Sequence, residues 1–340
     1  MAVRPVGFAV LGLGNLAQSA ILPAFRGTKR AKLVAVVSRD LEKARRLAGV
    51  HGAPGAYDNL ESCLADPLVE AVYIATPPGS HLAEVEAAAR AGRHVLCEKP
   101  LAVTAPEAAQ MVATCATQPV LLMTAYRKCF EPSIVFIRDL IHSGRLGTLK
   151  ILHTSFSERH ALSQTSPPWI LERKLAGGGP LMDLGIYCVH TARWLAGEIP
   201  DRVSALQWTH NQTLFREVEE GMAFSMYFPS GLVAQASTCY SAALSSMLYI
   251  EGTNGSVSLT PAFPYEHPRV LNARFGSIVL RKNFPVVDEF RPQIEAFSRA
   301  IRGGPLPPSG GAEGYIDMAI IEALYRSAEA GVPQAVEFGS

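Results

Sequence analysis

The sequence predicts an α/β protein of two domains: a parallel sheet covered by helices, followed by a large, mainly antiparallel open sheet. The chain has 340 residues, which is more than one hydrophobic core usually organises. Over its first 125 residues, short apolar runs alternate with helical patterns, as in the βαβ units of a parallel sheet. After residue 126, strand-like runs follow one another with only turns between them. We therefore expect domains at residues 1–125 and 126–340.

The strands expected in the first domain are apolar runs rich in Val, Ile, Leu and Ala. They cover residues 6–12, 32–38, 71–76, 94–98 and 120–125, with a weaker sixth strand near residues 56 and 57. Helical patterns lie between them. In one of these, Leu82, Val85 and Ala89 share a face, and Gly92 follows where the helix should end. This alternation predicts a sheet with helices on both faces.

The second domain is expected to begin with a helix at about residues 133–143 and a strand at 150–158. A stretch rich in Pro, Gly and Ser comes next, then a helix, and then five strands at residues 202–210, 221–229, 232–240, 246–252 and 256–260. Within the second of these five, large apolar residues alternate with small or polar ones. One sheet face can therefore cover helices, and the other can meet a partner subunit. The chain ends in two helical patterns that can pack back on the first domain.

Composition narrows the range of partners and compartments. The 31 basic residues nearly balance the 30 acidic ones, so the basic excess typical of nucleic-acid or anionic-membrane binding is missing. The six cysteines include no C-x-x-C pair and lie mostly in apolar runs, which predicts reduced, buried thiols. No secretory signal pattern occurs, and no apolar run reaches the roughly 18 residues of a membrane helix. We expect a cytoplasmic protein.

A glycine-rich turn follows the first strand, in LGLGNLAQ. Gly12, Gly14 and Ala17 form the pattern G-x-G-x-x-A between a strand and a helix. Gly12 permits a tight turn, Gly14 lets the backbone approach a pyrophosphate, and Ala17 allows close packing of helix on strand. The strand–turn–helix context favours a dinucleotide site over a simple turn. Asn15 and Leu16, in the same turn, are expected beside the phosphates of a Rossmann domain.

The end of the second strand bears on which dinucleotide binds. Ser38 and Arg39 offer a hydroxyl and a guanidinium, which suit the 2′-phosphate of NADP. Asp40 leaves NAD as the alternative, since an acidic residue would hold a ribose 2′-hydroxyl. However, Asp40 lies two positions late, and Asp is a favoured N-cap for the helix that follows. The sequence favours NADP.

Polar residues also follow the fourth and fifth strands, where open α/β sheets bind ligands. Thr76 and Pro77 leave one strand, and Glu98 and Lys99 leave the other; with His81, they are expected to bind the cofactor. A partly desolvated lysine beside a nicotinamide can bind a substrate hydroxyl and lower the pKa of a neighbouring acid/base. The alternative for Lys99 is a surface lysine on a loop. The alternative for His81 is a residue at a helix N-terminus that binds no ligand.

The segment GGGPLMDLGIYCVH places Asp183, Tyr187 and His190 on an apolar helix. At about 100° per residue these side chains, with Trp194, fall on one stripe. Tyrosine can donate or accept the proton of an alcohol if a cation lowers its pKa from about 10. One Asp and one His make a poor metal site, so no metal is expected. A buried structural network is the other alternative.

Several long motifs give the chain a family resemblance. They are GLGNLAQSAILPAF, ATPPGSHLAEVEAAARAGRHVLCEKPLA, AYRKCFEP, LAGGGPLMDLGIYCVHTARWLAG, IEGTNGSVSLTPAFPYE and EGYIDMAIIEALYRSA. The sequence resembles the glucose-fructose oxidoreductase, inositol dehydrogenase and MocA family. Within it, the G-I-Y and P-A-F segments are most similar to the glucose-fructose oxidoreductase branch. The resemblance implies a Rossmann domain joined to an open-sheet α/β domain, a nicotinamide cofactor, a sugar or polyol substrate, and a homodimer or homotetramer built on the sheet.

The resemblance also implies roles for single residues. Lys99 would be the catalytic lysine, followed by Pro100 after a cis peptide bond. Asp183 would orient the substrate, and Tyr187 would be the acid/base that other members supply as histidine. Arg127 would line the nicotinamide and the substrate.

The chain departs from the family pattern at two places. His190 stands where the family has an aspartate, and Ile170 follows Trp169 where arginine is common. We keep both regions in the substrate site. The expected substrate-binding residues are Lys99, Arg127, Trp169, Asp183, Tyr187 and His190.

The residues together predict reversible hydride transfer between a nicotinamide and a sugar or polyol carbon, with Tyr187 moving the hydroxyl proton. Two alternatives remain: an oxidoreductase for a non-sugar carbonyl or a dihydrodiol, and a non-catalytic dinucleotide-binding regulator. The sequence of the stretch from Arg159 to Lys174 does not indicate which substrate binds.

Overall fold

The computed structural model describes residues 4–159 and 168–339. These residues form two compact units. The first unit comprises residues up to 102, residues 106–127 and residues 288–315, and the second comprises residues 103–105, 128–287 and 316 onward.

A six-stranded parallel sheet is the centre of the first unit, in the order β3-β2-β1-β4-β5-β6. Its strands are β1 Val6–Leu11, β2 Ala31–Val37, β3 Gly55–Tyr57, β4 Ala71–Ile74, β5 His94–Cys97 and β6 Leu122–Thr124. Every residue of β1 and β4 is buried, because helices pack against both faces of a parallel sheet. The predicted strands, including the weak one at residues 56 and 57, are therefore confirmed.

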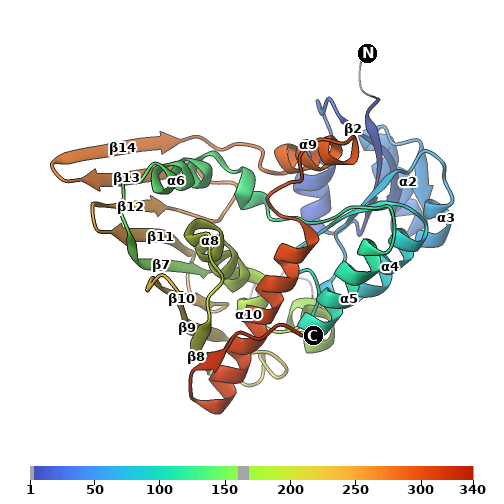
Figure 1. Ribbon diagram of the computed structural model, residues 1–340. Helices are drawn as coiled ribbons and strands as arrows, with labels where there is room; N and C mark the ends of the chain where they lie inside the picture. Colours follow the sequence, from blue (N-terminus) through green and yellow to red (C-terminus); the bar gives the residue numbers. More distant parts are fainter. Residues whose placement is uncertain (1–3, 160–167, 340) are drawn as a thin grey trace. The chain divides into compact units, whose positions relative to one another are not determined.

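Helices surround this sheet (Figure 1). They are α1 Leu22–Ala24, which continues a π-helical turn at Ala17–Ile21, then α2 Leu41–His51, α3 Leu60–Leu64, α4 His81–Arg90, α5 Ala105–Ala116 and α9 Phe290–Ile301. Local capping fixes their ends: Asn59 accepts from the backbone N–H of Ser62 at the start of α3. The late helix α9 belongs to this unit, where Phe297 meets Phe8 edge to face with ring centroids 6.3 Å apart.

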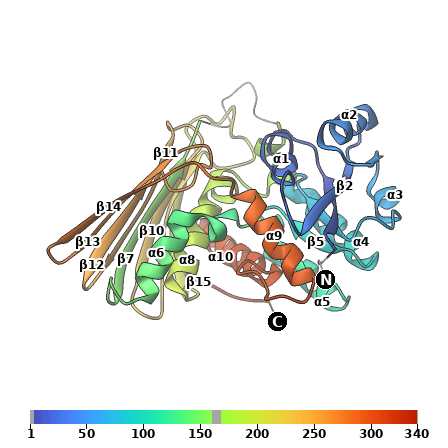
Figure 2. The same cartoon turned by 90° about the horizontal axis from the view of Figure 1, so that it is seen from above.

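The second unit contains a nine-stranded sheet in the order β14-β13-β12-β11-β7-β10-β9-β8-β15, in which only β7 and β10 pair in parallel. The strands are β7 Leu149–Ser157, β8 Arg202–Trp208, β9 Gly221–Tyr227, β10 Val233–Cys239, β11 Ser245–Gly252, β12 Gly255–Thr260, β13 Arg269–Phe275, β14 Ile278–Phe284 and β15 Gln334–Ala335. Figure 2 shows α6 Pro132–His142 and α8 Ile186–Ala196 on one side of this sheet. The unit also holds α7 Arg173–Ala176 and most of α10 Gly311–Ala330.

The two faces of the large sheet differ as the alternation predicts. Met222, Phe224 and Met226 of β9 are buried, whereas Ala223 and Ser225 between them are only half-buried. The opposite face carries a mixed row of side chains in register across five strands. This row runs through Ser225, Gln235, His153, Tyr249 and Ser258. The predicted fold class, a parallel Rossmann sheet plus a mainly antiparallel sheet, is confirmed.

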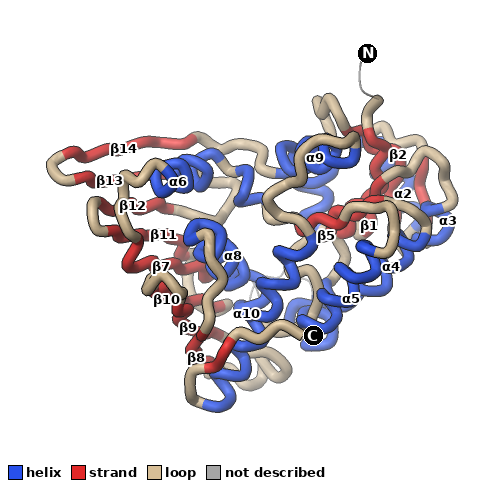
Figure 3. Tube along the Cα trace, viewed as in Figure 1, coloured by secondary structure: helices blue, strands red, loops and turns tan. Residues whose placement is uncertain are grey.

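The hairpin of β13 and β14, which lies at one edge of the sheet in Figure 3, was not predicted from the sequence. Most of β14 is exposed, so its hydrophobic alternation is weak. The Gly276–Ser277 pair indicates this hairpin, because it is a typical two-residue loop between two runs of strand-forming residues. All six cysteines are free, and five are buried, as predicted. No helix in residues 4–159 and 168–339 is both long and apolar enough to span a membrane.

Candidate functional site

The turn after β1 is tightly packed at Gly12 and open at Gly14. Gly12 adopts φ +88°, and its N–H donates to the carbonyl of Val37. A Cβ at Gly12 would lie 2.6 Å from the carbonyl of Ala75, so no larger residue fits. At Gly14, by contrast, a Cβ would meet nothing within 4 Å, which leaves the backbone open to a ligand. These features fit a dinucleotide, which Gly12, Gly14, Asn15 and Leu16 would hold.

The end of β2 presents Ser38 and Arg39 beside this turn. Arg39 is exposed, and the Ser38 hydroxyl accepts from the backbone N–H of Asp40. Asp40 itself accepts from the N–H of Lys43 at 3.0 Å and begins α2. The N-cap alternative for Asp40 is therefore confirmed, and its carboxylate already has a structural use.

The loop after β4 is braced by a buried histidine. His81 is fully buried; its Nε2 lies 2.9 Å from the carbonyl of Thr76 and its Nδ1 lies 3.1 Å from that of Leu101. Burial lowers the pKa of this imidazole. The Thr76 hydroxyl bonds to Glu84, and burial raises the pKa of that carboxyl to about 7. His81 thus joins the loops after β4 and β5, and its expected cofactor contact stays a prediction, as do those of Thr76 and Pro77.

Glu98 and Lys99 lie where β5 ends. Glu98 is buried and accepts from the Tyr73 hydroxyl at 2.8 Å and from the N–H of Lys99 at 3.2 Å. Burial raises the pKa of Glu98, although the Lys99 charge opposes this. The Lys99–Pro100 peptide bond is cis, as the resemblance implied. Glu98 is therefore a support for the lysine backbone, and Lys99 is half-buried.

Arg127 is buried and forms an ion pair with Glu289. Its guanidinium also lies over the ring of Phe290, 5.8 Å from the centroid. Both partners come from the late segment that joins the first unit. The sequence analysis did not include Glu289, whose distance along the chain hides the pairing.

Asp183 lies in a π-helical turn, Leu181–Gly185, that precedes α8. π turns widen a helix by one residue and occur often at functional sites. The Asp183 carboxylate accepts from the Tyr240 hydroxyl at 3.1 Å. Asp183 is half-buried, so part of it reaches the surface of its unit.

Tyr187 is held by aromatic rings. Its ring packs against Phe156 of β7 at 5.8 Å and against Phe263 at 6.0 Å between centroids. Phe263 belongs to the P-A-F segment that the resemblance singled out. The ring is 8% exposed, which fixes its orientation. A fixed ring suits a group that moves a proton.

His190 does not share the surroundings of Asp183 and Tyr187. Its Nδ1 lies 2.7 Å from a carboxylate oxygen of Asp317 on α10, and its Nε2 lies 3.2 Å from the Sγ of Cys129. Arg193 binds the other oxygen of Asp317 at 2.8 Å. The prediction of one common stripe assumed a regular helix, and the π turn at Leu181–Gly185 changes the helical phase between Asp183 and the residues of α8. Tyr187 and His190 both belong to α8, lie about 60° apart around it and meet different neighbours. The buried-network alternative describes His190 best.

Trp169 is half-buried in a short 3-10 turn, and Ile170 beside it is buried. Residues 160–167 of the expected specificity segment lie outside the described residues.

The sequence analysis also missed Glu219. This buried carboxylate accepts from the N–H groups of Gly179 and Leu181 and from the hydroxyl of Tyr325. A Cβ at Gly179 would lie 2.2 Å from the carbonyl of Glu219, and one at Gly178 would lie 2.0 Å from the Tyr325 hydroxyl. The glycine run is therefore required by close packing, and Glu219 anchors the start of the π turn.

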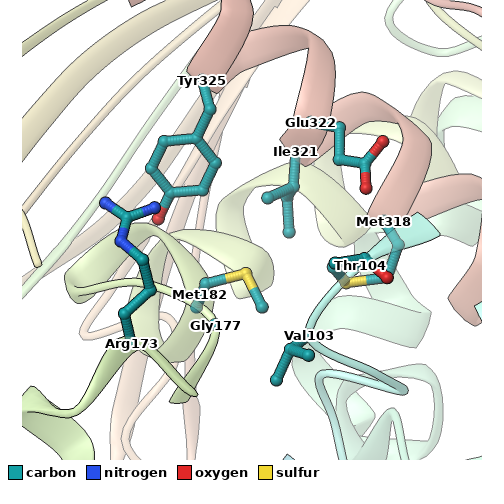
Figure 4. A pocket seen from close by; sticks show the side chains of 9 residues that line it. All are labelled: Val103, Thr104, Arg173, Gly177, Met182, Met318, Ile321, Glu322 and Tyr325. Carbon is teal, nitrogen blue, oxygen red and sulfur yellow. The ribbon is translucent and has the colours of Figure 1, made fainter. Parts of the chain in front are cut away.

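A cavity of about 260 Å³ opens in the second unit beside Gly177, the first residue of this glycine run (Figure 4). Met182, Met318 and Ile321 form its apolar lining, and Arg173 and Glu322 stand at its edges. None of Lys99, Asp183 and Tyr187 lines it. Among the residues described, no group of three or more His, Cys, Asp and Glu side chains could hold a metal ion.

Comparison with known proteins gives consistent results over both units. Residues 6–126 match the model of the oxidoreductase family with an NAD-binding Rossmann fold, and residues 134–258 match the GFO/IDH/MocA C-terminal domain. The chain is 33% identical over 327 residues to the D-xylose 1-dehydrogenase (NADP(+)) 2 of Haloferax volcanii, covering 95% of this chain and 98% of the relative. It is 34% identical over 260 residues to the rabbit (Oryctolagus cuniculus) trans-1,2-dihydrobenzene-1,2-diol dehydrogenase, covering 76% and 74% of the two chains.

A solved structure is also similar throughout. The aldose-aldose oxidoreductase of Caulobacter crescentus, crystallised with glycerol, superposes with a TM-score of 0.91 at 33% identity, covering 98% of this chain and all of that one. The two family models, the relatives that match over nearly the whole chain and the motifs in the sequence all indicate the same family. The chain belongs to the GFO/IDH/MocA family of oxidoreductases.

Proposed function

We propose that this protein is an NADP-dependent oxidoreductase that transfers hydride between the nicotinamide and a sugar or polyol. The observation that carries the proposal is the similarity, over nearly the whole chain, to relatives named as sugar oxidoreductases, one of them NADP-dependent. The open glycine turn and the Ser38–Arg39 pair support the cofactor assignment.

The nicotinamide supplies hydride acceptance and donation, and the chain supplies binding and proton transfer. In the direction of oxidation, the Oη of Tyr187 acts as the phenolate and takes the proton of the reacting hydroxyl, which leaves the neutral phenol. The Lys99 ammonium donates to that hydroxyl and stabilises the negative charge that develops on its oxygen. The Asp183 carboxylate accepts from a neighbouring sugar hydroxyl and fixes the ring of the sugar.

The proposal is tested by following NADPH absorbance with NADP+ and a panel of D-xylose, D-glucose and L-arabinose. We expect turnover with at least one aldose and faster turnover with NADP+ than with NAD+. Cofactor binding without turnover on any substrate would favour a non-catalytic regulator instead.

A dihydrodiol substrate is the second candidate, because the rabbit relative named for that activity is 34% identical. The same assay with a trans-dihydrodiol separates the two: a diol turned over faster than every aldose would replace the sugar.

Cofactor choice gives a further prediction at Arg39. Arg39→Ala removes the exposed guanidinium proposed for the 2′-phosphate, so KM for NADPH should rise about tenfold while KM for NADH stays close to wild type. Lys43→Ala, in the first turn of the helix α2 that follows Arg39, is the control. Equal changes for both cofactors would remove Arg39 from 2′-phosphate recognition.

The mixed face of the nine-stranded sheet supports a homodimer or homotetramer. Met247 is 39% exposed on this face, opposite Ser155, and a buried charge there would oppose association. Met247→Glu should convert the oligomer to a 36.5 kDa monomer in light scattering. Leu68→Glu, an exposed apolar site on the other unit, should not. An unchanged mass for Met247→Glu would place the interface elsewhere.

The free cysteines support the cytoplasm as the compartment of this protein, because disulfides are rare there.

A further inference from the structure

Strand β10 and Tyr240, the residue that follows it, make two side-chain hydrogen bonds to the segment that carries Asp183. Thr238 and Tyr240 point to the same side of the chain because they are two residues apart. The Thr238 hydroxyl donates to the carbonyl of Pro180 at 3.2 Å, and the Tyr240 hydroxyl donates to Oδ2 of Asp183 at 3.1 Å. Both side chains are at most 1% exposed. The strand therefore holds the π turn at its beginning and at its functional carboxylate.

We propose that Tyr240 is a positioning residue for substrate recognition, which orients the Asp183 carboxylate toward the hydroxyl groups of the sugar. The inference rests on the proposed function. Tyr240 does not touch the substrate itself, because its ring is 1% exposed and its hydroxyl is directed at Asp183.

Asp183 lies on a widened turn, where the backbone hydrogen bonding is less regular than in an α-helix. A carboxylate on such a turn needs a second anchor to keep one rotamer. A bond from a buried neutral donor to a charged acceptor is about twice as strong as one between neutral groups. Burial and the nearby Asp183 both raise the pKa of Tyr240 well above its ordinary value, so this hydroxyl keeps its proton and stays a donor.

The strand also explains why this anchor is rigid. The backbone N–H of Tyr240 donates to the carbonyl of Glu220 at 3.0 Å, which extends the ladder of β9 and β10 by one residue. Glu219, next in sequence, holds Gly179 and Leu181. The π turn is thus fixed at its start, over residues 179–181, and at Asp183 itself.

The test compares Tyr240→Phe with Thr238→Val. Each variant loses one buried hydroxyl from the same strand, but only Tyr240→Phe loses the bond to Asp183. With NADP+ and the fastest aldose of the panel, Tyr240→Phe should raise KM for the aldose about tenfold, with kcat changed by less than about threefold. Thr238→Val should leave KM within about twofold of wild type, although both variants lower the urea midpoint.

A second comparison isolates the pair. Asp183→Asn raises KM by itself, and adding Tyr240→Phe to it should change KM by less than about twofold, because the bond to a charged carboxylate is already gone. Tyr240→His, which keeps a ring N–H donor, should recover part of the loss and serves in place of Tyr240→Phe if that variant does not fold.

An active wild type whose KM is unchanged by Tyr240→Phe, or a KM raised equally by Thr238→Val, would overturn the positioning role alone. A wild type that turns over no aldose would overturn the proposed function and this inference with it.

Discussion

Tyr187→Phe should lower kcat for aldose oxidation about a thousandfold and leave the affinity for NADPH within about twofold of wild type. General acid/base groups contribute about 10²–10⁴ to a rate, and phenylalanine cannot move a proton. The substitution keeps the ring, so the packing against Phe156 and Phe263 is retained. Steady-state kinetics and NADPH titration by fluorescence measure the two quantities.

The matched control is Tyr249→Phe, which removes a hydroxyl from the mixed face of the large sheet and should leave kcat unchanged. Undiminished turnover in Tyr187→Phe would remove this residue from the mechanism and return the acid/base role to another group.

Asp317→Asn should lower the free energy of unfolding by about 3 kcal/mol. Asp317 is completely buried and accepts from Arg193 and from His190, so the change leaves a buried guanidinium without its counter-charge. Urea unfolding followed by circular dichroism measures the loss. Glu42→Gln, in an exposed ion pair with Arg45, should cost less than about 1 kcal/mol. Equal effects of the two substitutions would contradict the structural role given to the His190 network.

The stabilisation that Asp317 gives through Arg193 and His190 depends on pH, and the direction of this dependence follows from the pKa of Asp317. Burial alone would raise the pKa of the Asp317 carboxyl, but the Arg193 guanidinium and the contacts with Arg193 and His190 outweigh burial and hold this pKa at about 2, below its ordinary value of 3.8. A folded-state pKa below the unfolded one means that the stabilisation, about 2 kcal/mol, is complete above about pH 4 and is lost as the pH falls toward 2. Asp317→Asn should therefore flatten the acid limb of stability between pH 4 and pH 2, and an unchanged acid limb would contradict the shift.

The first unit was the more predictable half. Strands β1 and β2 lie within one residue of their expected bounds, because buried parallel strands are continuous apolar runs. The glycine turn could be predicted because its G-x-G-x-x-A pattern lies between a strand and a helix, although the contact that excludes a side chain at Gly12 is with Ala75 after β4. The exposed strand β14 gives no such run and was missed.

The supports of the candidate site were not predictable. Asp317 is 127 residues from His190, and Tyr240 is 57 residues from Asp183, so neither pairing leaves a periodic signal. The π turn at Leu181–Gly185 shifts Asp183 out of phase with α8, which a pattern that assumes a regular helix cannot show. Within α8, the tertiary contact with Asp317 gives His190 surroundings that differ from those of Tyr187.

The central claim, hydride transfer from a sugar carbon to NADP+, is tested most directly with an isotope. The aldose that turns over fastest is supplied fully deuterated on carbon, and the NADPH formed is examined by mass spectrometry. The account predicts one deuterium in each NADPH, with transfer lost in Tyr187→Phe. NADPH that carries no deuterium, or a cofactor that binds and stays oxidised with every sugar and diol, would contradict it.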